Sequence, residues 1–134
     1  MAIEIRSADV EPITEHALVK VHSMVPKFSM REETQGTYLE FVDVFELPPG
    51  VRAEPHYHNT HEFYFLLEGE AVLQIEDEVV KVRPNQLAYI PPNAKHTARI
   101  LDKPVRGLSF SVSYQEPFDP GYYPCELPEV TLDD

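Results

Sequence analysis

The sequence contains only one cysteine, Cys125, so the chain cannot form an internal disulfide bond. A lone cysteine suits a reducing compartment. Residues 1–6 lack the basic start and apolar run of a signal peptide. No segment approaches the roughly 18 consecutive apolar residues that cross a bilayer. From these absences we expect a cytoplasmic protein that has no membrane partner.

Basic residues are also scarce. The chain has 11 Lys and Arg against 23 Asp and Glu, which gives a formal net charge of −12. The Lys and Arg residues form no cluster. Nucleic acids and anionic membranes bind basic patches, so we expect no nucleic-acid partner, and the acidity mainly favours solubility.

Long helical patterns are missing as well, and short apolar segments take their place. These segments are rich in Val, Ile, Phe, Tyr and Leu, and Pro, Gly, Asn or Asp residues separate them. This spacing predicts an all-β sandwich or barrel. The expected strands are Tyr38–Leu47, Glu62–Leu67, Ala71–Glu76, Val79–Arg83, Leu87–Ile90, His96–Leu101 and Val105–Tyr114.

A chain of 134 residues has the size of one domain. We expect residues 1–35 to form an N-terminal arm with one or two short strands and residues 36–115 to form the barrel. Residues 116–134 contain four prolines and no Lys or Arg. They predict an extended acidic tail, which either lies over its own barrel, lies over a partner subunit, or is disordered.

Metal-ligating residue types gather in two stretches of the sequence. His56, His58 and Glu62 lie within seven residues, between Gly50 and Gly69, and His96 follows in a second stretch. Three imidazoles and one carboxylate suit one divalent metal ion, and they do not choose among Fe, Mn, Ni, Co and Zn.

Strand geometry supports a common site for these residues. Side chains at positions i and i+2 of a strand share a face, so His56 and His58 point the same way. By the same rule Tyr64 shares the face of Glu62, and the neighbouring His61 points to the opposite face.

The two stretches resemble the paired motifs of the cupin superfamily. The first motif is glycine, five residues, His-x-His, three or four residues, Glu, six residues and glycine. This chain fills every fixed position of that motif, with Gly50, His56, His58, Glu62 and Gly69.

The second motif is glycine, five residues, Pro-x-Gly, two residues, His, three residues and Asn. Here Pro91 and His96 are in frame, Asn85 and Asn93 replace the two glycines, and Ile100 replaces the final Asn. Asparagine tolerates the left-handed backbone region best after glycine, so both turns remain feasible.

The resemblance covers about residues 38–114 and is to a small, single-domain, metal-binding cupin. It implies a double-stranded β-helix, or jelly-roll barrel, that holds the metal inside. The implied metal ligands are His56, His58, Glu62 and His96. It also implies a small-molecule substrate and a homodimer, because cupins are often homodimers.

Tyr64 is the best candidate for a catalytic side chain, because a phenol on the Glu62 face can donate a hydrogen bond or a proton to a substrate oxyanion. His61 is a weaker candidate for a proton shuttle, and its alternative is a surface position. Phe41, Phe45 and Phe110 are candidate walls of an apolar pocket.

Three His and one Glu resemble the ligand set of cupin dioxygenases. We therefore expect a metal-dependent enzyme acting on a small organic substrate, with non-haem dioxygenase-like C–C cleavage as the first hypothesis. Two alternatives stay open. One is a redox-neutral isomerase, cyclase or lyase that uses the metal as a Lewis acid, and the other is a non-catalytic small-molecule-binding protein.

Overall fold

The computed structural model describes residues 4–15, 19–34, 39–112 and 121–132. These residues contain no helix that is long and apolar enough to cross a membrane. Their eleven strands are β1 (Ile13–Glu15), β2 (Val19–Val25), β3 (Leu39–Leu47), β4 (His56–Tyr57), β5 (His61–Glu68), β6 (Ala71–Ile75), β7 (Glu78–Val82), β8 (Leu87–Ile90), β9 (His96–Ile100), β10 (Val105–Val112) and β11 (Tyr123–Pro124).

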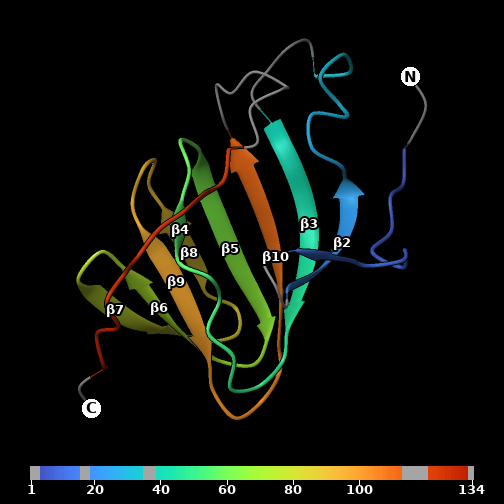
Figure 1. Ribbon diagram of the computed structural model, residues 1–134. Coiled ribbons are helices and arrows are strands. Elements are labelled where there is room, and N and C mark those ends of the chain that lie inside the picture. The colour runs from blue at the N-terminus through green and yellow to red at the C-terminus, as the bar shows by residue number, and fades with distance from the viewer. Residues whose placement is uncertain (1–3, 16–18, 35–38, 113–120, 133–134) are drawn as a thin grey trace.

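The strands form two antiparallel sheets. The six-stranded sheet has the order β1-β2-β3-β10-β5-β8, and the five-stranded sheet has the order β11-β4-β9-β6-β7. Figure 1 shows the two sheets facing each other across the interior. The all-β jelly-roll prediction is therefore confirmed, and the seven expected strands correspond to β3 and β5–β10.

The barrel has an apolar core of nine buried residues. Gly107 of β10 makes room for it, because an added Cβ there would lie 2.6 Å from the ring of Phe45. The core members are Phe45, Leu47, Leu66, Ala71, Leu73, Val82, Ile90, Ile100 and Val105.

The turns between strands use the left-handed backbone region. Gly50 and Gly69 have φ values of 76° and 79°. Asn85 and Asn93, which replace the glycines of the second motif, adopt the same backbone region, with φ values of 69° and 64°. The substitutions therefore preserve the turn geometry, since asparagine tolerates this region.

The N-terminal strands are part of the six-stranded sheet. In β2, Val21 is the cross-strand neighbour of Phe45, and Ser23 is the neighbour of Asp43. β1 and β2, which lie within the range expected to form an arm, therefore extend this sheet, and β2 adds to the wall of the cavity.

The C-terminal segment lies over its own five-stranded sheet (Figure 1, red). The Cys125 amide donates a hydrogen bond to the Pro55 carbonyl at 3.0 Å. The side-chain amide of Gln74 donates to the Pro128 carbonyl at 2.7 Å. Three alternatives were open for this segment: contact with its own barrel, contact with a partner subunit, or disorder. The described part, residues 121–132, lies over its own barrel. Residues 116–120 and 133–134 lie outside the described ranges.

Candidate metal centre

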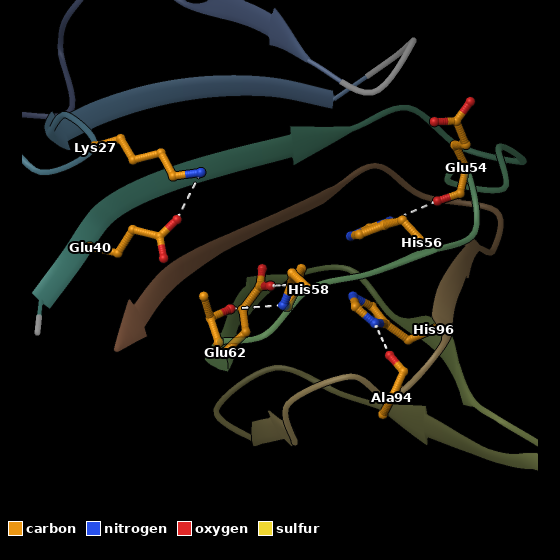
Figure 2. Close-up of polar contacts among 9 residues, drawn as sticks. Lys27, Glu40, Glu54, His56, His58, Glu62, Ala94 and His96 are labelled. Atoms are coloured by element: carbon orange, nitrogen blue, oxygen red, sulfur yellow. Dashed lines mark hydrogen bonds and ion pairs between the residues drawn. The ribbon is translucent and has the colours of Figure 1, made fainter. Parts of the chain in front are cut away.

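Three histidines converge inside the barrel. His56 of β4 and His96 of β9 are direct cross-strand neighbours, and His58 comes just after β4. One ligand nitrogen from each ring lies within 4.8 Å of the others, and all three side chains are buried. Figure 2 shows the rings turned toward a common space.

Backbone carbonyl groups orient two of the rings. His56 Nδ1 lies 2.8 Å from the Glu54 carbonyl oxygen, and His96 Nδ1 lies 2.9 Å from the Ala94 carbonyl oxygen. A carbonyl oxygen only accepts, so each Nδ1 carries the proton and each Nε2 presents a lone pair. This arrangement is common among metal-ligating histidines, because it fixes the ring and its tautomer.

Thr60 orients the third ring. Its hydroxyl oxygen lies 2.7 Å from His58 Nδ1, and the residue is only 2% exposed. Sequence reasoning missed Thr60, although a hydroxyl residue two positions after a candidate ligand was a usable signal.

The His96 ring has an unsatisfied nitrogen. Its Nε2 atom is buried and has no hydrogen-bond partner among the described residues. Burial, followed by the nearby His56, lowers the pKa of His96 from 6.5 to about 4. The ring is therefore neutral at pH 7 and can act as a ligand.

Glu62 lies at the edge of this cluster. Its carboxylate lies in close contact with His58 Nε2 (Figure 2). Burial acts to raise the pKa of Glu62, but hydrogen bonding to His58 and Tyr64 and the electrostatic influence of His58 and His96 outweigh it and lower the pKa to about 2. The side chain is thus an anion beside the imidazoles. Its role as the fourth ligand remains a prediction.

The cluster opens onto a cavity of about 420 Å³ between the sheets. The volume is sufficient for a small organic molecule. Besides the three histidines and Glu62, its walls include Glu15, Val21, Ser23, Lys27, Glu40, Phe41, Asp43, Phe45, Thr60, Tyr64, Leu73, Ser109 and Tyr122.

Tyr64 lines this cavity, on the same face of β5 as Glu62. Burial raises the pKa of Tyr64 well above its usual value, and the charge of Glu62 adds to the effect. The phenol is therefore protonated at neutral pH and able to donate a hydrogen bond.

His61 does not line the cavity. Its Nδ1 lies 2.7 Å from the Tyr89 hydroxyl, and the two rings stack with centroids 5.9 Å apart. Strand alternation thus turns His61 to the outer face of β5, as expected, and its role as a proton shuttle stays a prediction.

Phe110 was wrongly expected to line the pocket. It stacks on Phe63 outside the barrel, with ring centroids 4.8 Å apart, because the inward face of β10 is formed by alternate residues that include Ser109 and Ser111. Phe41 and Phe45 do line the cavity, as expected.

Tyr122 is a further wall residue that sequence reasoning missed. Its ring packs on His56 with centroids 4.5 Å apart, and its hydroxyl donates a hydrogen bond to the Glu54 carboxylate. The sequence offered no signal for this contact, since Tyr122 lies far from both motifs.

These residues fit a divalent metal ion. The three rings are held by their Nδ1 atoms, a buried Nε2 lacks a partner, and a carboxylate anion is adjacent. Nitrogen and oxygen ligands of this kind suit Fe, Mn, Ni, Co or Zn.

A family profile described as "Cupin domain" matches residues 43–111, more than half of the chain. The quercetin 2,3-dioxygenase of Bacillus subtilis (strain 168) is 26% identical over 113 residues, which are 77% of this chain and 33% of that protein. The dimethylsulfoniopropionate lyase DddW of Ruegeria pomeroyi is 36% identical over 53 residues, 40% of this chain and 35% of that protein. The chain thus spans about a third of the length of these curated relatives.

Among solved structures, the polyketide cyclase RemF from Streptomyces resistomycificus superposes with a TM-score of 0.70. It is 18% identical, and the match covers 96% of this chain and 89% of that one. At this identity the likeness supports the fold alone.

Proposed function

The chain belongs to the cupin family, and from that premise we propose that it is a metal-dependent enzyme acting on a small organic substrate. The observation that carries the proposal is the group of three buried histidines, which opens onto a cavity of about 420 Å³. A structural metal site is usually closed by protein ligands, whereas a site that opens onto a cavity can admit substrate.

Each residue has a distinct part in this proposal. His56, His58 and His96, together with Glu62, hold one divalent ion. That ion, when bound, polarises substrate oxygen atoms and, in a redox-active form such as iron, supplies a centre for dioxygen chemistry. Thr60 keeps the His58 ring in its ligating orientation, and Tyr64 donates a hydrogen bond to an oxygen of the substrate.

Within this class we propose dioxygenase-like cleavage of a C–C bond beside an enol or diketone. The similarity to quercetin 2,3-dioxygenase over 77% of the chain supports this reaction. The cavity supports it too, because the apolar side chains of Phe41 and Phe45 in its wall can pack against the carbon skeleton of a small organic substrate.

The second candidate is a redox-neutral lyase, cyclase or isomerase. It is supported by Tyr64, a protonated phenol on the cavity wall, which can donate a hydrogen bond or a proton to the substrate without any oxidant. The similarity to the lyase DddW covers 40% of the chain and points the same way.

The test combines elemental analysis of freshly purified protein with oxygen uptake on a panel of enols, diketones and aromatic diols. Oxygen consumption that matches product formation supports the dioxygenase. Tightly bound zinc without oxygen uptake ends that proposal, and turnover under nitrogen then supports the second candidate. Tight binding of panel members without any conversion would favour a non-catalytic binding protein.

The oligomeric state and the location of the protein belong to the same proposal. We propose a cytoplasmic homodimer. Light scattering of the purified protein tests the dimer, and fractionation of the source cells tests the location.

A further inference from the structure

The cavity has a second polar region, on the inner face of the six-stranded sheet. Ser23 of β2, Asp43 of β3, Ser109 of β10 and Tyr64 of β5 are successive cross-strand neighbours. Direct neighbours across antiparallel strands project to the same side of a sheet. All four residues line the cavity, and we call them the polar row.

Two buried carboxylates in this part of the cavity have oxygen atoms without hydrogen-bond partners. Asp43 is 9% exposed, and its Oδ1 has no partner among the described residues. Glu40 is 2% exposed, and Lys27 Nζ lies 2.9 Å from its Oε1, but its Oε2 has no partner in the described part of the chain. Buried polar atoms are rarely left in this state, so each oxygen is an acceptor available to a bound molecule.

The charge of the cavity wall favours binding of a hydrogen-bond donor over binding of an anionic group. Four carboxylates line the cavity: Glu15, Glu40, Asp43 and Glu62. All 11 Lys and Arg of the chain lie in the described ranges, and Lys27 alone among them lines this cavity. Arg52 and Arg106 do not line it, and they contact the Leu127 carbonyl and the Glu46 side chain.

We propose that Glu40 and the part of the polar row from Ser23 to Ser109 form a second subsite, which binds an uncharged or cationic hydrogen-bond donor at the far end of a substrate whose other end lies at the histidines, with Tyr64 between the two ends. Hydroxyl and ammonium groups meet this description, and carboxylate ends are rejected by like charge. The inference rests on the proposed function, because it assigns the substrate class of the same cavity.

The test uses four catechols as probes. Each carries the same two-carbon chain, which ends in a methyl, hydroxyl, ammonium or carboxylate group. Catechol oxygens bind the metal in each case, so only the far end differs. Dissociation constants are measured by calorimetry on cobalt-loaded full-length protein, with the cobalt absorption band as the report of binding at the metal.

We expect the ammonium probe to bind at least about tenfold more tightly than the carboxylate probe, with the hydroxyl probe between them. Asp43→Asn and Glu40→Gln should each reduce this ratio to less than about threefold and leave the methyl probe unchanged. Glu78→Gln, which removes an exposed carboxylate from β7, is the matched control and should keep the full ratio.

Equal affinities for the four probes in the wild-type protein would overturn the subsite. An unchanged ratio in folded, cobalt-loaded Asp43→Asn protein would overturn it as well. If Glu40→Gln does not fold, Ser109→Ala serves as the second variant. If the Ser109→Ala protein still prefers the hydroxyl probe to the methyl probe as strongly as wild type does, that result also counts against the polar row. Failure of the proposed function looks different, because protein that takes up no cobalt shows no absorption band with any probe.

Discussion

Replacing Asp43 with Asn should stabilise the metal-free protein at neutral and alkaline pH. The pKa of Asp43 is raised from 3.8 to about 6, because burial disfavours the charged form and Glu15 and Glu62 add like charge, against hydrogen bonding to Ser23. The folded protein therefore binds more protons than the unfolded chain between these two pKa values. Stability falls as the pH rises from 3.8 through 6, and the whole cost is present above about 6.

The size of the effect follows from the shift in the pKa of Asp43. The difference between 3.8 and about 6 is about 2 pKa units, or about 3 kcal/mol at about 1.4 kcal/mol per unit. The side chain faces a cavity that admits water, which screens part of this energy. We expect Asp43→Asn to raise the free energy of unfolding by about 1–3 kcal/mol at pH 8 and by about 0.5 kcal/mol or less at pH 4.

Urea denaturation of chelator-treated protein at both pH values measures this difference. Removal of metal matters, because a cation beside Glu62 would cancel one of the charges that act on Asp43. Glu78→Gln is the control for the lost charge and should change stability by less than about 0.5 kcal/mol at either pH. An Asp43→Asn protein that is no more stable than wild type at pH 8, or a gain of equal size at pH 4, would refute the reasoning.

Three further predictions concern the metal centre. His58→Ala and Glu62→Ala should each lose most of the bound metal in elemental analysis, while their circular dichroism spectra stay native. His61→Ala should keep the metal. Full metal occupancy in the first two variants, or a large loss of metal in the third, contradicts the ligand assignment. Thr60→Val should weaken metal affinity about 10–100-fold in chelator competition, because His58 Nδ1 loses its partner, and Thr60→Ser should restore it; equal affinity of Thr60→Val and wild type rejects this role. Tyr64→Phe should retain metal and lower turnover of an active substrate by about 100-fold or more, and unaltered turnover would remove Tyr64 from the chemistry.

Local rules were sufficient to predict the strands, and the two motifs predicted the histidine cluster. Turn residues bracket each short apolar segment, so β3 and β5 through β10 could be located from composition alone. The alternation of side chains along a strand placed His61 opposite Glu62, and the structure follows that rule. The asparagine turns were predictable as well, because Asn85 and Asn93 adopt the left-handed region that motif glycines would use.

The polar row could not be predicted, because it depends on strand register. Asp43 and Ser109 are cross-strand neighbours although more than 60 residues separate them in the sequence. Hydrophobicity also gave the wrong side for Phe110. An apolar residue usually faces the interior, but here the interior holds a partly polar cavity, and Ser109 of β10 lines it instead.

The C-terminal contacts were out of reach for a similar reason. The position of Tyr122 over His56 depends on where the C-terminal segment crosses the five-stranded sheet. Hydrogen bonds from Gln74 to Pro128 and from Arg52 to Leu127 help to set that path. Such pairings have no local sequence pattern.

Anomalous diffraction from crystals of metal-loaded protein, recorded at the absorption edge of the bound metal, tests the central claim most directly. We predict a single strong peak inside the barrel, about 2.0–2.2 Å from Nε2 of His56, His58 and His96 and from one carboxylate oxygen of Glu62. A peak at any other place in the chain, or none in protein shown by elemental analysis to carry the metal, would contradict the account.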